Sequence, residues 1–182
     1  MLIHPSVRYP RESVEDDEAL NSQGFAWHSN GVLFSCKDGC VWLAAYEAED
    51  AQVKPETETA ILVPVVVPKE GYLHTLSEDK EEPLKIMLEP GRYNLLFELR
   101  DLLSEEHSIE KYKEAYDLLE PNFRFTPELC TMTFVATEEK SKPQLLRFTP
   151  TIPMKYRKKV REGTMTVEDF MPKALILSEE KY

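Results

Sequence analysis

Apolar and polar residues alternate most clearly over residues 83–100, PLKIMLEPGRYNLLFELR. One set of alternating apolar positions precedes the dipeptide Pro90-Gly91, and a second set follows it, interleaved with Arg92, Asn94, Leu96 and Glu98. A period of two is typical of a half-buried β-strand, and Pro-Gly is a turn signal. The stretch therefore predicts a β-hairpin with one buried apolar face, formed by Leu84, Ile86, Leu88, Tyr93, Leu95, Phe97 and Leu99.

A second hairpin is predicted over residues 32–46. Its two halves alternate in the same way, with Val32, Phe34 and Cys36 before the loop and Val41, Leu43 and Ala45 after it. The residues between them, Lys37-Asp38-Gly39, suit a three-residue loop, because glycine adopts the positive φ that such a loop needs. A separate turn signal, Ser29-Asn30-Gly31, precedes this hairpin.

The remaining pattern predicts further strands and one helix. Residues 59–68, TAILVPVVVP, are apolar on both faces and predict a buried strand, which lies at an edge or is bulged at Pro64 because proline has no N–H. Shorter strands are expected within residues 71–77, 129–137 and 143–149. Residues 104–121 predict a helix, begun by Ser104 or Ser108 and ended by Pro121, with an apolar stripe of Ile109, Tyr112, Tyr116 and Leu119.

About seven or eight short strands with frequent turn signals favour antiparallel pairing over alternating βαβ units. The expected fold is mainly β: an antiparallel β-sandwich with one short helix and a C-terminal tail. We expect three regions: an acidic lead-in at 1–22, formed by a solvated loop or short helix, a β-sandwich domain at 23–150, and a basic C-terminal extension at 151–182. The extension holds Lys155, Arg157, Lys158, Lys159 and Arg161, followed by Thr166 as a candidate N-cap for Val-Glu-Asp-Phe.

Charge is unevenly distributed along the 182 residues. The net charge is −11; residues 1–120 hold 25 acidic and 11 basic residues, a net of −14, whereas residues 121–182 hold 8 and 11, a net of +3. This balance disfavours unaided binding of the chain to nucleic acid or an anionic membrane. No signal-peptide pattern or membrane-length apolar run is present, so we expect a cytoplasmic protein, without membrane insertion, whose three cysteines are reduced.

The sequence contains no familiar catalytic or metal-binding motif. Its six glycines form no phosphate-binding loop, and His4, His28, His74 and His107 lack metal-ligand spacing. Cys36 and Cys40 flank the second predicted loop, but with Cys130 they supply at most three of the four ligands of a structural zinc site. We therefore expect no enzymatic activity, no catalytic residue, no cofactor and no metal.

Two acidic clusters are the candidate partner-binding residues. Glu47, Glu49 and Asp50 leave a predicted strand together, and Glu78, Asp79, Glu81 and Glu82 crowd one predicted turn. They are either solvated side chains that keep the protein soluble, or a surface that imitates a phosphate backbone and occupies the cleft of a basic partner. The basic cluster near the C-terminus is likewise a solvated face, a contact with the protein's own acidic body, or a nucleic-acid contact.

A series of short motifs resembles the competence protein J family over roughly residues 20–150. The motifs are GFAWHSNGVLFS, ETAILVPVVVP, LKIMLEPGRYNLLFEL and LCTMTFVATEEKSKPQLLRFTP, in that order. Val65 stands where the family pattern has an aromatic residue, and residues 151–182 have no counterpart in it. The best-known member inhibits a membrane-associated DNA-entry nuclease in competent bacteria. The resemblance therefore implies a non-enzymatic, protein-binding β domain. It does not fix the partner, for which a basic nuclease of competence or immunity type is the candidate.

Two other function classes stay open on the sequence. A small-molecule-binding or structural subunit would use Trp27, Trp42 and Tyr46 if they face a groove. A small enzyme would need His28 or His74 to converge with carboxylates in a cleft.

Overall fold

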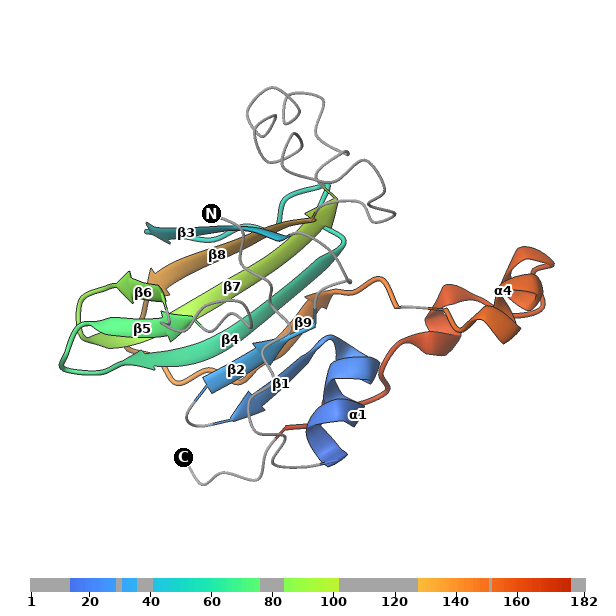
Figure 1. Cartoon of the computed structure of the whole chain (residues 1–182), viewed down its shortest axis with the longest axis horizontal. Coiled ribbons are helices and arrows are strands. Elements are labelled where there is room, and N and C mark those ends of the chain that lie inside the picture. Colours follow the sequence, from blue (N-terminus) through green and yellow to red (C-terminus); the bar gives the residue numbers. More distant parts are fainter. Residues whose placement is uncertain are drawn as a thin grey trace.

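The computed structural model of the chain describes residues 14–28, 31–35, 41–75, 84–101, 128–150 and 152–177. Within these ranges the fold consists of one five-stranded sheet, two small two-stranded sheets and short helices (Figure 1). The elements in chain order are α1 (Val14–Gln23), β1 (Phe25–His28), β2 (Gly31–Phe34), β3 (Val41–Ala48), β4 (Thr59–Val67), β5 (Tyr72–Thr75), β6 (Leu84–Met87), β7 (Gly91–Asp101), β8 (Glu128–Ala136), β9 (Gln144–Arg147), α4 (Met154–Arg161) and the 3-10 helix η2 (Val167–Phe170).

The five-stranded sheet has the order β3-β8-β7-β4-β9. The mainly β class expected from the sequence is confirmed, but the sheet is mixed, because β3 runs parallel to β8 while every other pair is antiparallel. The parallel pair has a simple cause in the connectivity. After β3 the chain returns through residues 49–58 to the starting end of the sheet and begins β4 in the same direction, so β3, β4 and β8 all run one way.

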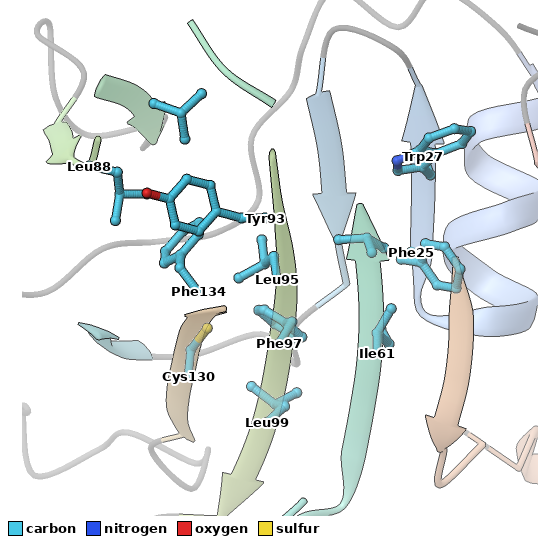
Figure 2. Packing of buried hydrophobic residues seen from close by; sticks show 12 residues of the cluster. Phe25, Trp27, Ile61, Leu88, Tyr93, Leu95, Phe97, Leu99, Cys130 and Phe134 are labelled. Carbon is cyan, nitrogen blue, oxygen red and sulfur yellow. The ribbon is translucent and has the colours of Figure 1, made fainter. Parts of the chain in front are cut away.

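The hydrophobic core lies between one face of this sheet and the two small sheets. Buried side chains of β4, β7 and β8 face the aromatic rings of the β1–β2 hairpin (Figure 2). The β5–β6 hairpin packs against this core with Leu73 and Ile86. The ring of Phe34 in β2 stacks on the ring of Phe97 in β7, with 3.8 Å between ring centroids. The small sheets therefore form the second layer that the β-strands of the large sheet need to bury their apolar face.

The buried face predicted for residues 83–100 is confirmed, although the hairpin is not. Leu88, Tyr93, Leu95, Phe97 and Leu99 belong to the core and Ile86 packs against it, while the side chain of Leu84 lies outside the described residues. However, β6 pairs with β5, and β7 pairs with β4 on one side and β8 on the other. Both edges of β7 are thus occupied by longer strands, which leaves no hydrogen-bonding edge for β6.

The hairpin predicted for residues 32–46 is wrong in its pairing. β2 pairs with β1, its predecessor in the chain, and β3 joins the large sheet beside β8. The signal at Ser29-Asn30-Gly31 thus belongs to the hairpin that forms. β1 contributes Phe25 and Trp27, whose rings are buried in the core, so the observed hairpin removes two large aromatic side chains from water.

The strand predicted over residues 59–68 is confirmed as β4, and those within 71–77, 129–137 and 143–149 are confirmed as β5, β8 and β9. β9 pairs with β4 only from Ala60 to Leu62, with a register shift, so Pro64 lies where β4 has no neighbour on that side. The Pro64 carbonyl accepts a bond from the Trp27 indole N–H at 3.3 Å instead. The helix predicted at 104–121 lies outside the described residues.

The two ends of the described chain are tied together. Part of the acidic lead-in forms the short helix α1, whose last residue, Gln23, is buried. The Gln23 side-chain amide donates to the Ile176 carbonyl at 2.9 Å and accepts from the Ile176 N–H at 2.7 Å. Leu175 and Leu177 pack against the core beside this clamp. Between β9 and the clamp, α4 projects beyond the sheets (Figure 1). Thr166, the predicted N-cap, forms a capping box with Asp169 at the start of η2.

Candidate functional site

Glu47, Glu49 and Asp50 lie at one end of the large sheet, and all three are exposed. Glu47 is the second-last residue of β3, and Glu49 and Asp50 follow the strand directly. The same end receives the end of β8 and the start of β7, because Glu47 is in register with Phe134 and Tyr93 with Ala136. We call this surface the acidic end; its exposed carboxylates are Glu47, Glu49, Asp50, Glu70, Glu89, Glu138 and Glu139, and Lys69, Arg92 and Lys140 are its nearest basic residues along the chain.

The Tyr93 hydroxyl lies beside Glu47 at the acidic end. The Tyr93 ring is buried against Phe134, while its hydroxyl lies 3.0 Å from the Glu89 carbonyl oxygen and 3.4 Å from Glu47 Oε1. Burial, followed by the nearby Glu47 charge, raises the pKa of the Tyr93 hydroxyl above 10.0. Tyr93 therefore stays protonated and can act as a donor toward these two oxygens at neutral pH.

The segment that carries Glu49 and Asp50 is pinned to the sheet by a buried carboxylate. Residues 49–58, which we call the crossover, pass over the face of the sheet opposite the core. Glu98 on that face is only 2% exposed. Its Oε1 accepts from the Lys54 backbone N–H at 2.9 Å and from the Thr57 hydroxyl at 2.7 Å. Two hydrogen bonds to a buried acceptor hold the far part of the crossover in one conformation.

Two arginines complete this attachment. Arg100 of β7 forms an ion pair with Glu56 at 2.7 Å, and Arg147 of β9 donates to the carbonyls of Lys54, Pro55 and Thr57 at 2.8–3.0 Å. The Glu56 backbone hydrogen bond, followed by the Arg100 charge, lowers the pKa of the Glu56 carboxyl below 4.5. The sequence did not predict the role of these residues. Alternation placed Glu98 on the face opposite the core, and it gave no signal that a loop covers that face.

The second predicted acidic cluster falls in a part of the chain that the structure does not describe. Glu78, Asp79, Glu81 and Glu82 lie outside the described residues, which stop at Thr75 and resume at Leu84. Thr75 and Leu84 face each other at one end of the β5–β6 pair, whereas the bond from the Leu88 N–H to the Gly71 carbonyl closes its other end, beside the acidic end.

The other candidate residues are scattered. Trp27 is buried in the core, and Tyr46 is exposed on β3; the side chain of Trp42 is not among the described ones. His74 is exposed and packs edge-on to Tyr72, while His4, His107, Cys36, Cys40 and the side chain of His28 fall outside the described part. Cys130 is buried. Across the described ranges, no three potential ligands gather as a metal site would require, and no helix is long and apolar enough to span a bilayer.

Comparison with known proteins identifies the family. A family model described as Competence protein J (ComJ) matches residues 4–120, which is more than half of the chain and runs through β1 to β7. No curated protein matches the chain, and no solved structure does. The match covers the first three of the four motifs that resemble the family, while the fourth, at residues 129–150, lies beyond it. The chain belongs to the competence protein J family.

Proposed function

We propose that this protein is a non-enzymatic, protein-binding module that inhibits a nuclease in the cytoplasm, and that its acidic end contacts the basic cleft of that nuclease. Members of the family act in general as inhibitors rather than enzymes. The observation that carries the finer proposal is the group of exposed carboxylates at the end of β3, formed by Glu47 in the strand and by Glu49 and Asp50 directly after it.

A nuclease cleft attracts the phosphates of DNA through positive charge, and a carboxylate surface satisfies the same charges. Glu49 and Asp50 form no ion pair with other described residues, so their charge is available to a partner. Inhibition then follows from occupation of the cleft, without any chemical step.

The carboxylates are also held in place before binding. The Tyr93 hydroxyl lies 3.4 Å from Glu47, and the attachment of Lys54 and Thr57 to Glu98 shortens the free part of the segment that carries Glu49 and Asp50. A surface that is ordered in the free protein loses less conformational entropy on association, which strengthens binding for the same contacts. We include the second acidic cluster, Glu78, Asp79, Glu81 and Glu82, as an additional contact with the nuclease, and only its negative charge supports this part of the proposal.

The test is a pair of triple variants with equal changes in net charge. The first is Glu47→Gln, Glu49→Gln and Asp50→Asn; the control is Glu18→Gln, Glu162→Gln and Glu168→Gln, whose residues are exposed on α1 and in the C-terminal part. The partner is captured from a native lysate and identified by mass spectrometry, and its DNA hydrolysis is measured with each protein added.

We expect the unmodified protein and the control to inhibit DNA hydrolysis, and the first triple to associate several-fold more slowly. The association rate of the unmodified protein should fall as ionic strength rises, since the Debye length shrinks from ~30 Å at 0.01 M to ~8 Å at 0.15 M. Equal association rates for the two triple variants would show that the acidic end does not contact the nuclease. If no captured nuclease is inhibited, the inhibitor function itself is refuted.

A further inference from the structure

The C-terminal part of the described chain forms a basic projection, which we call the basic arm: residues 152–170, with α4 and η2. Both of its ends are attached to the body. Just before it, the Thr149 hydroxyl donates to the Glu58 carbonyl at 3.1 Å, and after it Ile176 is clamped by Gln23. Figure 1 shows α4 standing out from the sheets, at the opposite end of the molecule's long axis from the tip of β3. The arm is thus a supported projection and not a loose end.

The arm has its own small apolar contact. Tyr156 and Val160, one turn apart on α4, are half-buried, and the Tyr156 ring lies 5.7 Å from the ring of Phe170 in η2. The chain reverses after α4 at Gly163, whose φ of +71° suits glycine and whose N–H donates to the Val160 carbonyl. This contact occupies one side of α4 and leaves the other side to solvent.

The solvent side of α4 carries five basic residues and no acidic one. With about 100° between successive helical residues, Lys155, Arg157, Lys158, Lys159 and Arg161 spread over roughly 200° of the helix surface, and all are exposed. Lys158 reaches Glu162 at 3.7 Å, an exposed pair that contributes little. The Lys155 and Lys159 ammonium groups lie 4.9 and 5.8 Å from the centre of the Tyr156 ring, which orients them beside the helix.

An apolar side chain stands in the middle of these charges. Met154 is 81% exposed, and helical geometry places it between Arg161 and Lys158 on the wheel. Val167 at the start of η2 is a second exposed apolar residue, at 40%. An exposed methionine among cations gains nothing from contact with water or phosphates. A helix that lies at a lipid interface, in contrast, uses both cationic and apolar side chains.

We propose that the basic arm binds the surface of an anionic lipid bilayer, with its five cations at the headgroups and Met154 in contact with the acyl region. The arm lies outside residues 4–120, the part that matches the family, and the inference goes beyond nuclease inhibition. The acidic body is repelled by such a surface, but charges separated by more than the Debye length of ~8 Å at physiological salt are largely screened. A bilayer-bound copy keeps its acidic end pointing away from the lipid, free to meet a partner.

The experiment measures co-sedimentation of the full chain with phosphatidylcholine vesicles that contain or lack phosphatidylglycerol. The arm variant is Lys155→Gln, Lys158→Gln and Lys159→Gln, and the matched control is Lys69→Gln, Lys140→Gln and Lys142→Gln, three exposed lysines outside the arm. A single variant, Met154→Ala, removes the apolar contact at constant charge. Circular dichroism and thermal unfolding establish that each variant is folded. A DNA duplex is titrated in the same buffer.

We expect binding to phosphatidylglycerol vesicles alone, lost with rising salt. Each basic residue near an anionic surface strengthens binding about fivefold, so the arm triple should bind about 100-fold more weakly and the control much as the unmodified protein does. Met154→Ala should weaken vesicle binding by a few-fold. The proposal is overturned if vesicles do not bind, if both triples lose binding equally, if Met154→Ala has no effect, or if the DNA duplex binds more tightly than the vesicles. None of these results bears on nuclease inhibition, which is measured without lipid.

Discussion

The stacked pair Phe34–Phe97 offers the sharpest test of how the two layers meet. Phe97 is 1% exposed at the centre of β7, and its ring lies parallel to that of Phe34, with 2° between the ring planes. The contact exists only because β2 lies over the sheet as part of the β1–β2 hairpin. Changing both residues, singly and together, therefore probes the arrangement that the sequence pattern did not predict.

The size of the effect follows from burial and from the ring contact. Phe97→Ala empties a fully buried site in the core and should cost about 3–5 kcal/mol of unfolding free energy. For a chain of this length, each kcal/mol corresponds to roughly 2–4 °C in Tm, so a fall of about 10 °C is expected. Phe34→Leu and Phe97→Leu keep most of the volume but remove the ring pairing, for which about 0.5–1.5 kcal/mol of coupling is expected.

The assay is urea unfolding followed by circular dichroism for the unmodified protein, the two leucine variants and the double variant. Their unfolding free energies form a double-mutant cycle whose coupling term reports the contact. Val66→Ala is the control, because Val66 is 65% exposed on the same sheet and its truncation should change stability by no more than about 0.5 kcal/mol.

Additive effects would refute the reasoning. If the double variant equals the sum of the single ones within about 0.3–0.5 kcal/mol, the two rings do not touch and β2 does not lie on β7. A Phe97→Ala variant as stable as Val66→Ala would refute the burial of Phe97 itself.

Three further expectations concern polar groups. Glu98→Ala leaves the Thr57 hydroxyl and a backbone N–H without their buried acceptor and should cost about 2–4 kcal/mol in urea unfolding, whereas Glu98→Gln, which keeps an acceptor, should cost less; equal losses would contradict the hydrogen-bond account. Because the pKa of Glu56 is lowered in the folded state, its contribution to stability is present above pH 4.5 and is lost as pH falls through the folded-state pKa. Glu56→Gln should therefore lose less stability on acidification than the unmodified protein. If stability falls equally with pH in both proteins, the Glu56 carboxylate does not make this contribution. Because the pKa of Tyr93 is raised, stability should fall as pH rises above 10.0 toward the folded-state pKa. In thermal unfolding, Tyr93→Phe should show a smaller decrease in Tm over this pH range than the unmodified protein. An equal decrease in both proteins would mean that other groups cause it.

Much of the local structure could be predicted because it depends on neighbouring residues. The alternation before and after Pro90-Gly91 correctly predicted which side chains of β7 enter the core, and the apolar run at 59–68 predicted β4 and the missing neighbour at Pro64. Thr166 was likewise recognisable as a cap from its immediate sequence. In each case the signal and its consequence lie within a few residues of each other.

The candidate site was predictable only in part. Charge and position after a strand singled out Glu47, Glu49 and Asp50, and the structure does bring them to one exposed end of the sheet. That the Tyr93 hydroxyl meets Glu47 there could not be seen, because the two residues come from strands more than forty residues apart in the sequence. The register of β3, β8 and β7 creates that meeting, and no short pattern encodes it.

The sequence by itself therefore determined that the chain is mainly β, where most of its strands run, which face of β7 enters the hydrophobic core, and, through the order of its motifs, the family. Tertiary structure alone decided that β2 pairs with β1, that β3 lies parallel to β8, and that Glu98 is buried beneath the crossover. The physical reason is that a strand with alternating side chains fits many neighbours equally well at the level of its own residues. The choice among them is made by the total apolar surface and the number of hydrogen bonds that the complete arrangement satisfies.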